Sequence, residues 1–144
     1  EAMDKFNKEG QTIGEEEERQ NFYHWVLVDI PAGTTSLAEG ANSSEVTPKG
    51  KKPGKTENGV RGVNDYTLYM SGDMKGEYGG YDGPCPPWND ARMHHYTFKV
   101  FALDVPTLGL SGAFTGPEAE AAMKGKVLAE GEAVGTYTLN PELR

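Results

Sequence analysis

The sequence GGYDGPCPPWNDARMHHYTFKVFALDV, residues 79–105, joins a loop rich in glycine and proline to the clearest strand of the chain. Apolar, aromatic and β-branched residues predominate from Tyr96 to Val105, and Pro106 lacks the N–H of a strand ladder, so a strand is predicted over 96–105. Successive side chains of a strand point to opposite faces. We therefore expect His94 and Tyr96 on one face and His95 on the other, so that the two adjacent histidines do not serve one site.

The segment GPCPP, residues 83–87, contains three prolines, which carry no backbone N–H. Only Gly83 and Cys85 can offer backbone donors, so this turn cannot form a nest of successive amides around an anion. It can be a preformed wall whose bound shape costs little entropy, or a structural turn fixed by proline. An anion held beside it needs side-chain donors, and the nearby candidates are His24, His94, His95, Tyr96 and Arg92.

Three further segments carry signals of regular structure. FYHWVLVDI, residues 22–30, has apolar side chains at both its odd and its even positions, which predicts a strand covered on both faces. Thr115 and Glu118 form a capping box and predict a short helix that glycines limit. A final strand is expected over about 129–139. Strands joined by long loops, with one short helix near the C-terminus, predict a mainly β sandwich.

The remaining segments are polar. Residues 1–21 are rich in glutamate and are expected to form an acidic arm or loop. Residues 38–62 form a long connection, which is either a surface excursion or a functional loop. This connection holds the basic patch of the chain, made of Lys49, Lys51, Lys52, Lys55 and Arg61. Residues 63–83 are rich in turn residues and contain four tyrosines.

Composition limits the classes of function. The chain has 144 residues, which fits one domain, and a formal charge of -8 with a pI of about 4.9, which argues against a general nucleic-acid or anionic-membrane binder. No stretch approaches the roughly 18 apolar residues of a membrane span. The single cysteine, Cys85, excludes an intramolecular disulfide and a multi-cysteine zinc site. The first residues do not resemble a signal peptide, so the cytoplasm is expected, with the periplasm left open because no initiator Met stands at position 1.

Catalytic chemistry has weak support in the sequence. Cys85 lies between prolines rather than at a helix N-terminus, which disfavours a reactive thiolate. A metal site from His24, His94 and a carboxylate is geometrically conceivable, but no metal-binding spacing indicates it. Hydrolase, phosphate-loop and dinucleotide motifs were not found. We therefore expect a protein that is not an enzyme and that uses no cofactor and no metal. His24, among apolar neighbours, requires a hydrogen-bond partner or a ligand, because an unsatisfied buried imidazole costs about 1–3 kcal/mol.

Four segments, taken in order, resemble one family. FYHWVLVDIPAG (22–33), GVRGVNDY (59–66), YDGPCPPWNDARMHHYTFKVFALD (81–104) and VLAEGEAVGTYT (127–138) are similar to phosphatidylethanolamine-binding proteins, and in particular to their bacterial Raf-kinase-inhibitor-like branch. The resemblance implies a sandwich of two antiparallel sheets with a small pocket for phosphate, acetate-like anions or phospholipid headgroups, and no established turnover. Carried over by position, it implies the pocket residues His24, Trp25, Gly83, Cys85, Pro86, Pro87, His94 and Tyr96.

One family motif was not found. An Asp-Pro-Asp-x-Pro sequence, which contributes an acid to the family's pocket, does not precede the His24-Trp25 pair. Either the chain is a fragment, with a domain over 22–144 that lacks N-terminal strands, or its pocket lacks this acid. The leading hypothesis is a binding protein that holds phosphate or a phosphorylated headgroup between His24, His94 and the 83–87 rim. The alternatives are a protein-interaction module that inhibits a kinase or protease through the rim and the long loops, and a hydrolase or metal enzyme that uses the same histidines.

Overall fold

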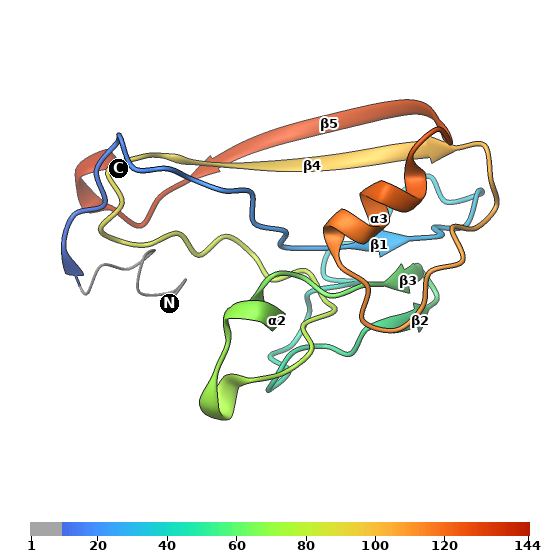
Figure 1. Ribbon diagram of the computed structural model, residues 1–144, viewed down its shortest axis with the longest axis horizontal. Helices are drawn as coiled ribbons and strands as arrows, with labels where there is room; N and C mark the ends of the chain where they lie inside the picture. Colours follow the sequence, from blue (N-terminus) through green and yellow to red (C-terminus); the bar gives the residue numbers. More distant parts are fainter. Residues whose placement is uncertain (1–9) are drawn as a thin grey trace. The chain divides into compact units, whose positions relative to one another are not determined.

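The computed structural model describes residues 10–144. Its strands form two antiparallel sheets, one with the order β1-β3-β2 and one made of β4 and β5. Figure 1 shows these elements. In chain order they are β1 (Leu27–Val28), β2 (Gly54–Thr56), β3 (Gly59–Arg61), α2 (Tyr66–Tyr69), the 3-10 turn η2 (Gly72–Met74), β4 (His94–Leu103), α3 (Gly116–Met123), β5 (Val127–Tyr137) and the 3-10 turn η3 (Pro141–Leu143).

The chain divides into two compact units. The described part of unit 1 consists of residues 10–21, 84–101 and 130–144, and unit 2 consists of residues 22–83 and 102–129. Strands β4 and β5 contribute residues to both units. The predicted β-rich architecture with two antiparallel sheets is confirmed, and α3 is the short helix expected near the C-terminus.

Unit 2 has its core between β1 and α3. Val26, Val28, Phe114 and Ala119 are buried together, and Tyr23 and Val60 pack against them. Strand β3 pairs with β1 through Val28 and Val60, and with β2 through a tight hairpin in which Thr56 faces Gly59. Gly59 has a φ of 136°, a conformation that only glycine adopts readily, which explains its place at the end of this hairpin.

The helix α3 begins as the capping box predicts. The backbone N–H of Thr115 donates to Glu118 Oε2 at 2.7 Å, and the Thr115 hydroxyl donates to the same oxygen at 2.9 Å. Gly116, at the first helical position, lies against the ring of Tyr23, so a Cβ there would overlap the ring. The helix ends at Met123, and Gly125 follows with a φ of 77°, which confirms that glycine limits the helix.

The first predicted strand is much shorter than its apolar run. Only Leu27 and Val28 pair as a strand, because Asp29 has a φ of 53° and ends the ladder. Upstream, the backbone is bonded to loops: the Tyr23 carbonyl accepts from Asp65 N–H and the His24 carbonyl from Asp82 N–H. The prediction of a strand over 22–30 is therefore wrong in length.

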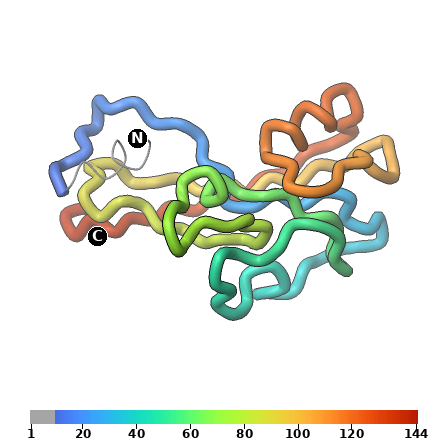
Figure 2. Tube along the Cα trace, turned by 60° about the horizontal axis from the view of Figure 1, so that its bottom comes forward, coloured from blue at the N-terminus to red at the C-terminus, as the bar shows by residue number. Residues whose placement is uncertain are grey.

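The long connection is more ordered than its composition suggested. Residues 38–62 contain β2 and β3, and residues 63–83 contain α2 and η2, none of which the sequence pattern indicated. The connection lies alongside residues 79–81, where Gly79 N–H donates to Lys51 O at 2.6 Å and Tyr81 N–H to Asn42 O at 2.9 Å. Figure 2 shows this excursion folding back within unit 2.

Strands β4 and β5 form a long ribbon whose bounds lie within two residues of the predicted ones. On β4, His94 and Tyr96 are half-buried and His95 is exposed, as expected from strand alternation. All residues of β5 are exposed. Among residues 10–144, no helix has the length and apolar character that crossing a bilayer requires.

Candidate functional site

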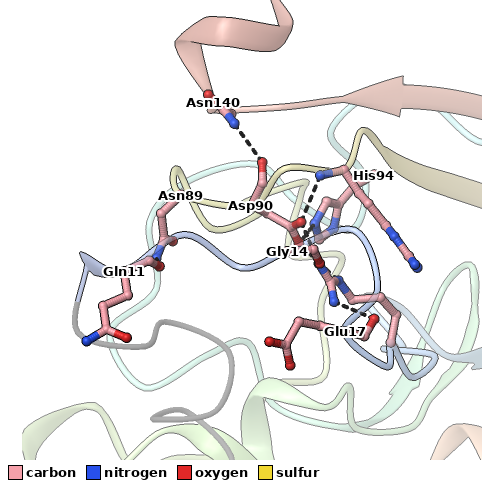
Figure 3. Close-up of polar contacts among 9 residues, drawn as sticks. Gln11, Gly14, Glu17, Asn89, Asp90, His94 and Asn140 are labelled. Atoms are coloured by element: carbon pink, nitrogen blue, oxygen red, sulfur yellow. Dashed lines mark hydrogen bonds and ion pairs between the residues drawn. The ribbon is translucent and has the colours of Figure 1, made fainter.

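The candidate site in unit 1 is built around His94, the first residue of β4. Its Nε2 lies 2.8 Å from Oδ2 of Asp90, four residues earlier in the loop that leads into the strand. The side chain of Asp90 is 3% exposed, whereas that of His94 is 28% exposed. Figure 3 shows the imidazole directed at this buried carboxylate. The strand thus presents a titratable ring that is anchored on one side and reachable by solvent.

Arg19 is the second partner of the buried carboxylate. Its Nε donates to Asp90 Oδ2 at 3.1 Å, and its Nη2 donates to Oδ1 at 2.7 Å, which is a bidentate ion pair. The remaining guanidinium bonds go to the backbone oxygens of Glu17 and Gly14, at 2.6 and 3.0 Å. Arg19 therefore compensates the charge of Asp90 and ties residues 14–19 to the site.

Asp90 stays ionised despite its burial. Burial raises the pKa of this carboxyl, but hydrogen bonds from Arg19, from the backbone N–H of Arg92 and from His94, together with the charge of Arg19, outweigh it and lower the pKa below its ordinary value of 3.8. An ionised carboxylate only accepts hydrogen bonds. Near neutral pH the hydrogen in the His94–Asp90 bond consequently belongs to Nε2 of His94.

The backbone of Asp90 holds three segments together. Asn140 Nδ2 donates to Asp90 O at 2.8 Å, and Asp90 forms a parallel bridge with Ile13, which is 4% exposed. The neighbouring Asn89 accepts from Ile13 N–H at 2.9 Å. Residues 13–19 of the predicted acidic arm thus contain one buried residue, Ile13, and the arginine that pairs with the buried Asp90.

The other predicted residues of unit 1 flank this cluster. The ring of Tyr96 stacks on that of His94 with a centroid distance of 6.4 Å. In the proline-rich turn Pro86 is buried, Pro87 is half-buried and Cys85 is exposed. Cys85 is thus a surface thiol on a stiff turn.

The remaining predicted residues, His24, Trp25 and Gly83, belong to unit 2. Nδ1 of His24 donates to the Asp82 carbonyl at 2.7 Å, and its ring lies 4.9 Å from Phe22 and 5.6 Å, edge to face, from Tyr66. Nε1 of Trp25 is buried without a hydrogen-bond partner among the described residues, and its ring lies 5.9 Å from Tyr81. Gly83 is exposed. The expected pairing of His24 with His94 stays a prediction.

Asn64 is a positioning residue that sequence reasoning missed. It is 1% exposed, and its Nδ2 lies 2.6 Å from Asp82 Oδ2, 3.0 Å from Gly80 O and 3.4 Å from His24 O. Its Oδ1 accepts from Tyr66 N–H. One buried amide therefore joins the backbone of His24, the 80–82 loop and α2. Its position could have indicated this role, because Asn64 is a polar residue in GVRGVNDY, one of the segments that resemble the family.

Two surface hollows lie apart from the predicted residues. One is lined by Lys99, Glu130, Gly131 and Glu132 on the β4–β5 ribbon. The other is lined by residues of β2, β3 and their connection, and by Asp29 and Pro31 after β1. None of the predicted site residues lines either hollow. Within residues 10–144, no group of three or more His, Cys, Asp or Glu side chains is arranged to hold a metal ion.

Comparison with known proteins gives consistent matches. The sequence profile of the family described as Phosphatidylethanolamine-binding protein matches residues 12–138. UPF0098 proteins of Aquifex aeolicus and Pyrococcus horikoshii are 35% and 38% identical over 116 residues, which cover 81% of this chain and 56% and 49% of theirs. Escherichia coli YbcL is 35% identical over 99 residues, covering 66% of this chain and 45% of its own. The chain thus spans about half the length of the curated relatives it matches.

A solved structure agrees with these sequence matches. The crystal structure of E. coli YbcL, described as a new member of the mammalian PEBP family, superimposes with a TM-score of 0.57 and 25% identity. The superposition covers 81% of this chain and 61% of the YbcL chain. The structural match and the sequence matches therefore indicate the same family.

Proposed function

Because this chain belongs to the phosphatidylethanolamine-binding protein family, we propose that it is a non-catalytic binding protein for a small phosphate-bearing ligand. The ligand is free phosphate or the phosphorylated headgroup of a lipid, which share the same anionic oxygens. The observation that carries the proposal is the half-exposed His94, anchored by the buried Asp90 and placed beside Tyr96.

The charges around His94 favour an anion. Arg19 already compensates Asp90, so a protonated His94 leaves the cluster of these three residues with one net positive charge. An imidazolium gives charge-assisted hydrogen bonds, which are about twice as strong as neutral ones. In a chain with a formal charge of -8, a local positive charge is what allows an anion to bind at all.

The proline-rich turn fits a binding role better than a catalytic one. Cys85, Pro86 and Pro87 lie within ten residues of His94 in the sequence, and proline restricts the backbone before any ligand arrives. A preformed wall lowers the ordering cost of binding. It supplies few donors, so side chains such as His94 and Tyr96 must provide the polar contacts.

The test is a titration of the protein with inorganic phosphate, followed by NMR signals of the histidine rings at pH 6 and pH 8. We expect the His94 signals to move, with tighter binding at pH 6. His94→Gln should weaken binding at least tenfold, whereas His95→Gln, on the opposite face of β4, should leave it unchanged. Equal effects of the two variants, or unmoved His94 signals, contradict the proposal.

Two further arms complete this test. Glycerophosphoethanolamine is titrated beside phosphate, and a stronger response to it identifies the lipid headgroup as the source of the phosphate group. His24→Gln is measured separately, because His24 lies in the other unit and its contribution is independent of the argument for His94. Incubation with phosphomonoester and ester substrates should give no turnover, and measurable hydrolysis that His94→Gln abolishes would make the protein an enzyme instead.

A second function, a protein-interaction module that inhibits a kinase or protease, is favoured by one loop. Val46 is 96% exposed at a tip where Glu45 has a φ of 65°, and Lys51 Nζ closes the loop by donating to Glu45 O and Thr47 Oγ1 at 2.9 Å each. A rigid loop that exposes an apolar side chain suits contact with a protein partner. Val46→Ser should then abolish inhibition in a panel of purified proteases and kinases, with Val134→Ser as the control.

A further inference from the structure

We infer that Asp90 positions His94 so that an anionic oxygen of a ligand can be held only at its Nδ1, and only after His94 has taken up a proton. The ligand part of this inference rests on the proposed function, whereas the part that concerns the imidazole itself does not. Neither Asp90 nor Arg19 was among the residues that the sequence assigned to the site.

The first step is the choice of tautomer. Nε2 of His94 lies 2.8 Å from Oδ2 of Asp90, a carboxylate whose other bonds also come from donors, namely Arg19 and the backbone N–H of Arg92. A carboxylate held ionised by such donors has no hydrogen to give. The neutral imidazole must therefore carry its hydrogen on Nε2 and a lone pair on Nδ1.

The second step concerns the nitrogen that remains. Nδ1 of His94 makes no hydrogen bond to any residue of the described part of the chain, and the side chain is 28% exposed. In the neutral ring this atom presents a lone pair, which repels an anion. In the imidazolium it is a charged donor. The holding of an anionic oxygen at His94 is thus coupled to the uptake of one proton.

The third step concerns the charged groups that face His94. From the loop of residues 84–93 comes the carboxylate of Asp90, which favours the imidazolium; from residues 10–21 comes Arg19, which opposes it through the same carboxylate. Along β4 the neighbour of His94 is the ring of Tyr96. Asn140, just before η3, is uncharged and bonds the backbone carbonyl of Asp90. Arg92 faces Asp90 through its backbone N–H, and its side chain is exposed.

The two charged neighbours therefore act in opposite directions. Removing the charge of Asp90 leaves Arg19 near the ring and should move the titration midpoint of His94 to lower pH. Removing the charge of Arg19 leaves Asp90 uncompensated and should move the midpoint to higher pH. A purely structural role for Asp90 predicts loss of folding in both variants, with no opposite displacement of the midpoint.

The decisive measurement is a long-range proton–nitrogen NMR spectrum of the histidine rings, without ligand, between pH 5 and pH 9. In the unmodified protein we expect the neutral His94 to have its hydrogen on Nε2. Asp90→Asn should lower and Arg19→Gln should raise the midpoint, each by at least half a pH unit, and Arg92→Gln should leave it in place. An Nδ1–H tautomer, or midpoints that move the same way, overturns the inference. If Asp90→Asn does not fold, the inference is still tested by the tautomer of His94 in the unmodified protein and by the His94 midpoint in Arg19→Gln.

Anion binding is then measured with sulfate as well as phosphate, because the charge of sulfate is constant over this range. Affinity for sulfate should fall by about tenfold for each pH unit above the His94 midpoint, as the loss of one bound proton requires. A binding curve that does not change with pH overturns the coupling. If the tautomer and the midpoints are as expected but neither anion binds, the proposed function fails, while the positioning role of Asp90 stands.

Discussion

Replacing Arg19 by glutamine should destabilise unit 1 strongly, because it leaves a buried carboxylate without its counter-charge. The side chain of Asp90 is 3% exposed and that of Arg19 is 21% exposed, so the pair is largely shielded from water. Breaking one partner of a buried pair costs about 3–5 kcal/mol. Asp90 keeps its bonds from Arg92 N–H and His94, so we expect the lower end, about 3 kcal/mol.

The assay is unfolding in urea at pH 7, followed by circular dichroism. Arg92→Gln is the matched control, since it removes an arginine two residues from Asp90 whose side chain is exposed, and it should change the free energy of unfolding by less than about 0.5 kcal/mol. The double variant Arg19→Gln/Asp90→Asn should be more stable than the sum of the two single losses predicts, because it removes the uncompensated charge. A loss for Arg19→Gln no larger than that for Arg92→Gln would refute the reasoning.

The same pair predicts how stability depends on pH. The pKa of Asp90 is lower in the folded protein than its ordinary value of 3.8, so its contribution is present above that value and is lost as pH falls through the folded-state pKa. In Arg19→Gln the main influence that lowers this pKa is gone and burial, which raises it, remains. The loss of stability on acidification should therefore be smaller in the variant, because the folded-state pKa of Asp90 no longer lies as far below its value in the unfolded chain.

Three further predictions concern unit 2. Asn64→Ala should cost about 2–3 kcal/mol in urea unfolding, because it leaves the Gly80 carbonyl and Asp82 carboxylate without their donor, and it should broaden the NMR signals of His24. Thr115→Ala removes the cap hydroxyl of α3 and should cost about 1 kcal/mol in the same assay, whereas Thr115→Ser should cost less. Burial and then the hydrogen bond with Glu120 raise the pKa of Tyr23 to about 12, so Tyr23→Phe should remove a late tyrosine titration seen by absorbance. The contribution of Tyr23 to stability should be lost as pH rises from about 10 to 12.

Local signals predicted the elements that local interactions make. The helix α3 follows from the capping box of Thr115 and Glu118, three residues apart, and β4 follows from the alternation of its side chains. The hairpin of β2 and β3 was missed because its residues are polar and glycine-rich, and what fixes it is pairing with β1. The first strand was predicted too long because the apolar run gives no sign that Asp29 adopts a φ of 53° and ends the ladder.

In the candidate site, too, only the features that depend on neighbours in the sequence were predictable. Strand alternation correctly separated His94 and Tyr96 from His95, because it depends only on neighbours in the sequence. The ion pair of Arg19 with Asp90 joins residues 71 positions apart, and no periodicity or spacing connects them. Asn64 likewise acts through carbonyls 16 and 40 positions away. Long-range pairing of buried polar groups is the part of the site that a single sequence does not reveal.

The arrangement around Asp90 also sets an order for folding. Its partners, Arg19 and Asn140, lie 71 positions before it and 50 positions after it, so their contacts require two long loops to close. Contacts of such separation form slowly, whereas the β2–β3 hairpin and α3 involve neighbours in the sequence. During synthesis on the ribosome, unit 2 has all of its residues once position 129 has left the exit tunnel, but Asp90 gains its last partner only after position 140 has done so. The nascent chain therefore acquires the complete His94 environment among the last steps of its folding.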